Sequence, residues 1–123
     1  MSTLRVNTLQ DATGSNQPAM VGAAKAWVNF NGIGTVAIRE SFNVSSITDN
    51  GTGDYTVNFT NAMPDVNYTP VMSGGYGSSQ NHYLYPCVSN ASAPTTSALR
   101  IYNAWPFSPW TGDGNYITVA VFR

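Results

Sequence analysis

Hydrophobic and polar residues alternate with a period of two along most of the chain, a pattern typical of strands that bury one face. In the segment 55–60, Tyr55, Val57 and Phe59 occupy every second position, so we expect these three side chains to face a core. No segment repeats apolar residues at the spacing of a helix, and the chain is therefore predicted to be all-β. Ala26, Val28 and Phe30 alternate in the same way with Lys25, Trp27 and Asn29, which indicates a second half-buried strand.

Segments rich in Gly, Pro, Asn and Ser separate the expected strands. The clearest turn is Asn50-Gly51, because both residues tolerate the positive φ of a tight hairpin. Glu40 interrupts the alternation over 36–44 and predicts a bulge or a break. Strands are expected at 4–9, 25–30, 36–44, 55–60, 68–73, 82–88, 97–104 and 116–123. This number and spacing of short strands predicts an antiparallel β-sandwich or a jelly-roll-like domain over 21–123.

The first twenty residues differ from the rest, because one short strand is followed by a polar, linker-like segment at 11–18. Leu4, Val6 and Leu9 give this strand its apolar positions. Two roles are equally consistent with it: an attachment strand that pairs with another subunit or a larger assembly, or a cap on a sheet edge of its own domain. We expect residues 1–20 to form an N-terminal attachment strand and a linker.

Charge excludes several classes of partner. Only 9% of the residues are charged, the net charge is −1, and the five basic residues are scattered, so no nucleic-acid partner is expected. No apolar run is long enough for membrane insertion, and the N-terminus lacks the layout of a signal peptide. The single cysteine, Cys87, excludes an intrachain disulfide and favours assembly in a reducing cytoplasm. With 42% hydrophobic residues, the chain is expected to associate with itself.

Residues capable of catalysis are few and poorly placed. His82 and Cys87 lie five positions apart on one expected strand and so point to opposite faces, which argues against a nucleophilic pair and against zinc. Asp49 and Asp54 flank a glycine-rich turn but lack the alternating acidic ligands of a calcium loop. The remaining carboxylates give no paired arrangement for glycoside hydrolysis. The sequence therefore predicts no enzyme, no metal and no cofactor.

Aromatic residues of the second half fall in or beside the expected loops. Trp and Tyr rings stack on sugar rings and offer rigid contact area with a polar edge, and Pro106 and Pro109 stiffen the loop at 105–110. These rings predict a ligand-contacting surface, although aromatic residues also fill cores and subunit interfaces, and both alternatives stay open. The candidate binding residues are Tyr76, His82, Tyr83, Trp105, Phe107 and Trp110.

Several stretches of the first half also resemble a known family. They read AAKAWVNFNG at 23–32, GTVAIR at 34–39, NVSSITDNGTGDYTVNFT at 43–60 and AMPDVNY at 62–68, after an opening TLRVNTLQD at 3–11. Together they resemble a recurrent module of tail-fibre and related virion proteins of tailed bacteriophages, including short fibre proteins of cyanophages. The resemblance covers residues 2–68 and ends there.

This resemblance implies a virion location in a tail or head appendage, assembled in the host bacterial cytoplasm. It further implies a homotrimer that attaches to other virion proteins through its N-terminal segment and carries its C-terminal β-domain outward. The expected function is that of a short fibre or spike subunit that contributes to attachment to a host surface glycan or envelope protein. The alternatives are an architectural head-fibre, decoration or tail adaptor protein and, more remotely, a polysaccharide-degrading enzyme.

Overall fold

The computed structural model describes residues 2–3, 23–75, 84–106 and 110–123. Eight strands lie within these ranges, and none of the described residues belongs to a helix that could cross a membrane. The strands are β1 (Ala24–Asn31), β2 (Ala37–Phe42), β3 (Val44–Gly51), β4 (Asp54–Phe59), β5 (Thr69–Gly74), β6 (Tyr85–Val88), β7 (Ala98–Ala104) and β8 (Ile117–Phe122). The strand expected at 4–9 lies outside the described residues.

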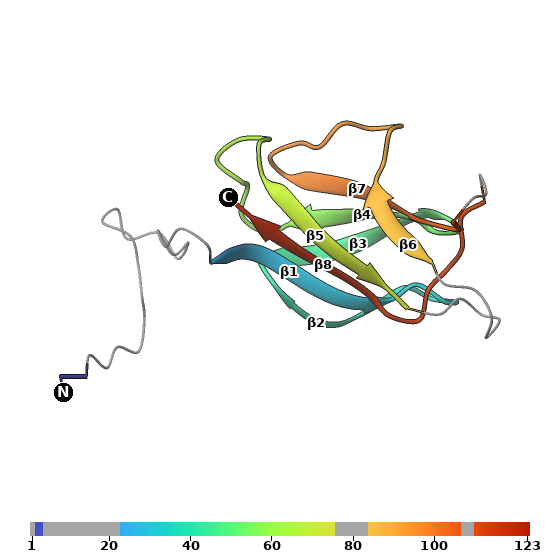
Figure 1. Cartoon of the computed structure of the whole chain (residues 1–123), viewed down its shortest axis with the longest axis horizontal. Coiled ribbons are helices and arrows are strands. Elements are labelled where there is room, and N and C mark those ends of the chain that lie inside the picture. The colour runs from blue at the N-terminus through green and yellow to red at the C-terminus, as the bar shows by residue number, and fades with distance from the viewer. Residues whose placement is uncertain (1, 4–22, 76–83, 107–109) are drawn as a thin grey trace.

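The strands form two stacked antiparallel sheets (Figure 1). Sheet A has the strand order β2-β1-β8-β5, and sheet B has the order β3-β4-β7-β6. The hairpins β1–β2, β3–β4 and β6–β7 each stay within one sheet, whereas β5 and β8 return the chain from sheet B to sheet A. The predicted all-β sandwich is therefore confirmed, and the strands expected at 25–30, 55–60, 68–73, 97–104 and 116–123 are observed to within one residue at each end.

The core lies between the two sheets and is built from the alternate positions that the pattern predicts. Tyr55 and Phe30 meet edge to face, with ring centroids 5.2 Å apart, and this geometry matches the charge distribution of aromatic rings. Phe59 and Tyr68 form a second such pair at 5.7 Å. The alternating apolar residues of β1 and β4 are all buried: Ala26, Val28, Phe30, Tyr55, Val57 and Phe59.

The chain passes from sheet A to sheet B at Asn43. The bulge predicted near Glu40 is present, because the pairing of β1 with β2 leaves Arg39 without a partner residue. The break comes three residues later, where Asn43 has a φ of +54°, a conformation that asparagine tolerates better than most residues. The Asn43 side chain donates to the carbonyls of Lys25 and Asn61, at 3.0 and 3.1 Å, and accepts from the Asn61 amide at 2.7 Å. This one side chain therefore joins both ends of the corner.

The prediction of a turn at Asn50-Gly51 was wrong by two residues. β3 continues through Gly51, which pairs with Asp54, and Thr52-Gly53 forms the turn. Gly53 has a φ of +65°, and a Cβ placed there would lie 2.5 Å from the backbone nitrogen of Gly112. The turn is therefore fixed by its close contact with a distant segment, which the local sequence does not reveal.

Candidate recognition site

The segment after β7 folds back on itself and brings two tryptophans together. Ala104 forms an antiparallel bridge with Thr111, and the Trp105 amide donates to the Trp110 carbonyl at 3.0 Å. These two contacts close the base of the loop, so Trp105 and Trp110 sit at the same end of the sandwich although they are five positions apart. The local sequence signal for a loop at this point is the pair Pro106 and Pro109.

Trp105, Trp110 and Thr111 line an open hollow of about 310 Å³. The Trp110 side chain is 73% exposed, whereas Trp105 is half-buried. Trp105 lies against Gly112, where a Cβ would come within 2.8 Å of the indole Nε1. The Trp105 ring is thus packed against the fold, whereas the Trp110 ring is exposed beside the hollow. This arrangement suits contact with a flat apolar face of a ligand.

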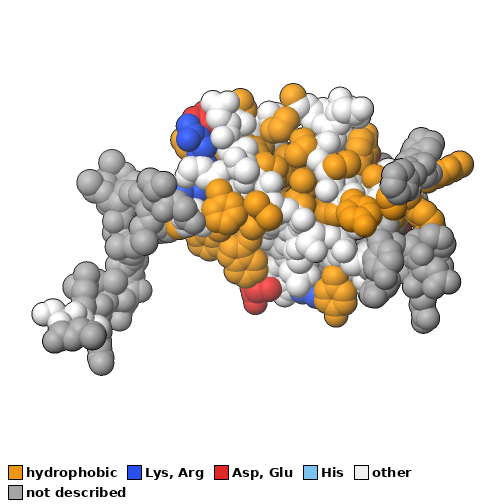
Figure 2. All heavy atoms as spheres, viewed as in Figure 1, with side chains coloured by type: hydrophobic (Ala, Val, Ile, Leu, Met, Phe, Trp, Pro, Cys, Tyr) orange, Lys and Arg blue, Asp and Glu red, His pale blue; other side chains and the backbone are white. Residues whose placement is uncertain are grey.

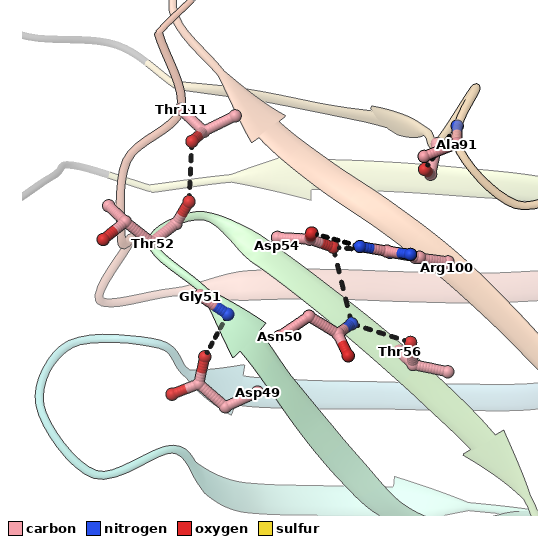
Figure 3. A network of polar contacts seen from close by, with 10 residues as sticks. Asp49, Asn50, Gly51, Thr52, Asp54, Thr56, Ala91, Arg100 and Thr111 are labelled. Carbon is pink, nitrogen blue, oxygen red and sulfur yellow. Dashed lines mark hydrogen bonds and ion pairs between the residues drawn. The ribbon is translucent and has the colours of Figure 1, made fainter.

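The β3–β4 turn forms hydrogen bonds with the residues at the base of this loop. Thr111 donates its hydroxyl proton to the Thr52 carbonyl at 2.6 Å (Figure 3). The Gly112 amide donates to the Asn103 carbonyl at 2.9 Å, and the Asn103 amide donates to the Gly53 carbonyl at 2.7 Å. Asn103 is fully buried, and its side-chain Nδ2 donates to the Gly112 carbonyl at 2.9 Å. The base of the hollow is therefore held by a continuous series of hydrogen bonds.

A buried tyrosine and a carboxylate complete this support. The Tyr55 hydroxyl donates to Asp113 Oδ1 at 2.6 Å, and the Gly53 amide donates to the same oxygen at 2.8 Å. The hydroxyl also lies 3.2 Å from the Gly32 carbonyl. Burial is the main cause that raises the pKa of Tyr55, and the hydrogen bond to Asp113 is the second. The phenol therefore keeps its proton at all ordinary pH values. The Asp113 carboxylate is therefore used to anchor the loop.

The outer face of sheet B extends from this end as a polar surface. Asn50 donates to Thr56 Oγ1 at 2.9 Å and to Asp54 Oδ1 at 3.4 Å, and Arg100 donates to both Asp54 oxygens at 2.9 and 2.6 Å (Figure 3). The hydrogen bond from Arg100 lowers the pKa of Asp54. Asp49 accepts from the Gly51 amide at 3.0 Å. The two acids that flank the glycine-rich turn are thus engaged within the protein, as expected of a turn and not of a calcium loop.

Tyr85 is an aromatic residue of this surface that was not among the candidate binding residues. It stands opposite Ala104 in the pairing of β6 with β7, and Ala104 is bridged in turn to Thr111. The Tyr85 ring is exposed, so it lies one strand away from the hollow. Tyr85 directly precedes Pro86 and begins an edge strand, which is a position where an exposed ring has no neighbour to pack against on one side.

The remaining candidate residues are placed as follows. Of the six predicted binding residues, the structure brings Trp105 and Trp110 together. The other four, and the three predicted attachment residues, lie outside the described residues: Tyr76, His82, Tyr83, Phe107, Leu4, Val6 and Leu9.

The described residues hold no cluster of three or more His, Cys, Asp or Glu side chains that could bind a metal. Cys87 is exposed on β6. Asp65, like Asp54, is bound by an arginine: Arg123 donates to both of its oxygens at 2.9 and 2.6 Å. That hydrogen bond lowers the pKa of Asp65 to about 2. The end of the sandwich that carries Trp105 and Trp110 can therefore bind a neutral polar ligand through rings, amides and hydroxyls. The carboxylates of Asp54 and Asp65 are instead bound by arginines.

Comparisons of the chain with protein-family models, with curated proteins and with solved structures gave no match.

Proposed function

We propose that this chain is a virion appendage subunit of a tailed bacteriophage, a short fibre or spike, and that it contributes to host attachment through the end that carries Trp105 and Trp110. The observation that carries the proposal is the Trp110 ring, 73% exposed beside a hollow of about 310 Å³. The resemblance of residues 2–68 to phage fibre proteins supplies the setting. The recognition role falls to the half of the chain beyond that resemblance.

The physical case for recognition is one of preorganisation. The Trp110 ring is largely exposed beside the hollow, so it offers a flat apolar face that a ligand can cover. The hydrogen-bonded base fixes both tryptophans before binding, and this reduces the entropy lost when a ligand docks. A sugar presents an apolar face to the ring and hydroxyls to the neighbouring Thr111 and Tyr85. The proposed ligand is accordingly a glycan of the host surface.

The proposed partners follow from the same setting. The chain assembles as a homotrimer and joins other virion proteins through its N-terminal segment, with Leu4, Val6 and Leu9 as the contact residues. An envelope protein is the alternative receptor. We propose no nucleic-acid partner, since the net charge is −1, and no membrane insertion.

We further propose that the protein is not an enzyme and needs no cofactor. Glycoside hydrolysis requires two carboxyl groups that face one another across a cleft. Asp54 and Asp65 are each bound by an arginine, and Asp113 accepts two hydrogen bonds from within the fold. Ion pairing of this kind keeps a carboxyl group ionised and unavailable as a general acid.

Binding to bacterial surface polysaccharides tests the proposal. The purified full chain is applied to a panel of immobilised lipopolysaccharides and capsular polysaccharides, beside Trp110→Ala and the control Val66→Ala. Val66 is also exposed, but it lies in the loop between β4 and β5. Loss of an aromatic anchor of this kind costs about tenfold or more in affinity, so Trp110→Ala should lose binding while the control keeps it.

Three outcomes separate the alternatives. Binding that survives Trp110→Ala would place the ligand elsewhere. If the wild-type chain binds nothing on the panel and fails to block phage adsorption to host cells, an architectural head-fibre, decoration or adaptor role replaces the receptor role. Release of reducing ends from any polysaccharide on the panel would reinstate the enzyme.

A further inference from the structure

An apolar row crosses the outer face of sheet A. Phe42 stands opposite Trp27 in the pairing of β2 with β1, and Trp27 stands opposite Ala120 in the pairing of β1 with β8. Ala120 stands opposite Val71 in the pairing of β8 with β5. Residues opposite one another on one face of a sheet are in direct contact range. The four side chains therefore form one continuous row, named here the sheet A row, across all four strands.

Three of the four members of the sheet A row are exposed, and Ala120 is half-buried. Trp27 is 37%, Phe42 39% and Val71 58% exposed. Of the nine large hydrophobic side chains that are exposed in the described part of the chain, five belong to the strands of sheet A or directly precede β8. Figure 2 shows hydrophobic side chains gathered on this side of the molecule.

The β3–β4 part of the outer face of sheet B has the opposite character. Asn58 donates to the hydroxyls of Ser46 and Thr48 at 3.1 and 2.9 Å, and Thr56 is bound by Asn50. These polar side chains form hydrogen bonds with one another and can also be exposed to water. This part of sheet B is thus suited to solvent, whereas sheet A leaves a row of aromatic and aliphatic side chains uncovered.

The size of the face suits a protein surface as its partner. Four strands about 4.8 Å apart, each rising about 3.3 Å per residue over some six residues, give a face of roughly 20 by 20 Å. Two such faces in contact remove about 800 Å² from water, which is the lower limit of a weak, transient interface. Association through this face is therefore expected to depend on protein concentration.

The charges around the sheet A row favour a second copy of the same chain. Arg39 and Glu40 are adjacent on β2, and both are exposed. Arg39 lies 4.0 Å over the Tyr116 ring at one end of the face, and Glu40 pairs with Asn29 on the same face. A surface that carries one cation beside one anion offers each charge an opposite partner when it meets a copy of itself. The net charge of −1 leaves little repulsion between copies.

We propose that the outer face of sheet A, centred on the sheet A row, is the surface through which copies of this chain associate. This inference rests on the proposed assembly into a homo-oligomer, but it does not depend on the receptor role of the Trp105–Trp110 end. Covering the row with a second copy removes its apolar side chains from water and leaves the polar face of sheet B and the tryptophan hollow open to solvent.

Sedimentation equilibrium of the full chain, from about 2 to 200 µM to span the affinities of weak interfaces, provides the test. Val71→Glu places a charge in the sheet A row at a highly exposed position of an edge strand. Val66→Glu is the matched control, because Val66 is 50% exposed and lies outside every strand. We expect dimers or trimers of the wild type and of the control, and at least a tenfold weaker association of Val71→Glu.

Each other outcome overturns the inference in a distinguishable way. A wild-type chain that stays monomeric across the range contradicts both the proposed self-assembly and the assigned face. An oligomer that Val71→Glu leaves unchanged contradicts the face alone, as does loss of association in both variants. Circular dichroism of each variant, compared with the wild type, shows that the sandwich is intact. Polysaccharide binding by the monomeric variant then reports separately on the receptor role.

Discussion

Replacing Tyr55 with Phe removes one hydroxyl group from the base of the tryptophan hollow and leaves the aromatic core in place. The ring of residue 55 keeps its edge-to-face contact with Phe30. Asp113 Oδ1 loses the donor at 2.6 Å and retains only the Gly53 amide. A hydrogen bond to a charged acceptor contributes about 1.5–3 kcal/mol, so we expect Tyr55→Phe to lower the free energy of unfolding by about 2 kcal/mol.

Urea unfolding at neutral pH measures this loss, and Tyr68→Phe is the matched control. The Tyr68 hydroxyl donates to the backbone carbonyls of Thr95 and Ala98, at 2.9 and 3.2 Å. Since these acceptors are neutral, the control should lose only about 1 kcal/mol. Equal losses in the two variants, or no loss in Tyr55→Phe, would refute the assignment of a charge-assisted bond to Asp113.

The pH dependence gives a second readout of the same bond. Burial and the Asp113 carboxylate raise the pKa of Tyr55 in the folded state above its ordinary value of 10.0. Below pH 10 the phenol is protonated in both the folded and unfolded states, and its full contribution to stability is present. Above pH 10 the unfolded phenol ionises first, which favours unfolding. The stability difference between wild type and Tyr55→Phe should therefore shrink as the pH rises above 10, and a constant difference would contradict the raised pKa.

Three further substitutions test the corner, the turn and the polar face, each by urea unfolding. Asn43→Ala removes three hydrogen bonds at a φ of +54° and should lower the free energy of unfolding by about 2–4 kcal/mol. Asn43→Gly should recover the part of this loss that comes from backbone strain. Equal losses in the two variants would show that φ is unimportant. Gly53→Ala should cost more than about 2 kcal/mol because its Cβ meets Gly112, and a neutral result would contradict the close contact. Arg100→Met should destabilise the protein at pH 7, because Asp54 then loses both hydrogen bonds from the guanidinium group. This loss should vanish as the pH falls below 3.8, because Arg100 lowers the pKa of Asp54 and protonation of Asp54 ends the pairing; persistence of the loss in acid would refute the pairing.

The fold class follows from the sequence because alternation reports directly on burial. Tyr55, Val57 and Phe59 face the core as the pattern predicts, and the limits of β1, β4, β5, β7 and β8 agree with the expected ones to within one residue. The sequence does not give the turn, since 50–53 reads Asn-Gly-Thr-Gly and contains two glycines that can each supply a positive φ. Both glycines have a positive φ, of +137° at Gly51 and +65° at Gly53, and Gly53 is the one that lies in the turn, in close contact with Gly112 about sixty residues away.

The candidate site is predicted only as far as its residue types allow. The aromatic and proline content of 105–110 points to a loop that presents rings, and Trp105 and Trp110 meet at its base. The residues that support the loop could not be predicted from the sequence, because Asp113 and Thr111 form their hydrogen bonds with partners on the distant β3–β4 hairpin.

The sequence does not reveal the sheet A row either, although Trp27 alternates with the buried Ala26 and Val28 along β1. Its alignment with Ala120 and Val71 depends on the strand order β2-β1-β8-β5, which is a long-range property. A pattern of burial along one strand says which face a residue occupies. It does not say which strand lies beside it.

The place and orientation proposed for this chain in a phage particle are tested most directly by a three-dimensional electron-microscopy reconstruction of particles assembled with it. We predict density for the sandwich in a tail or head appendage, with the N-terminal segment towards the particle and Trp110 at the outward end, exposed to solvent. Absence of the chain from the particle, or a position with Trp110 buried against another virion protein, would contradict the account.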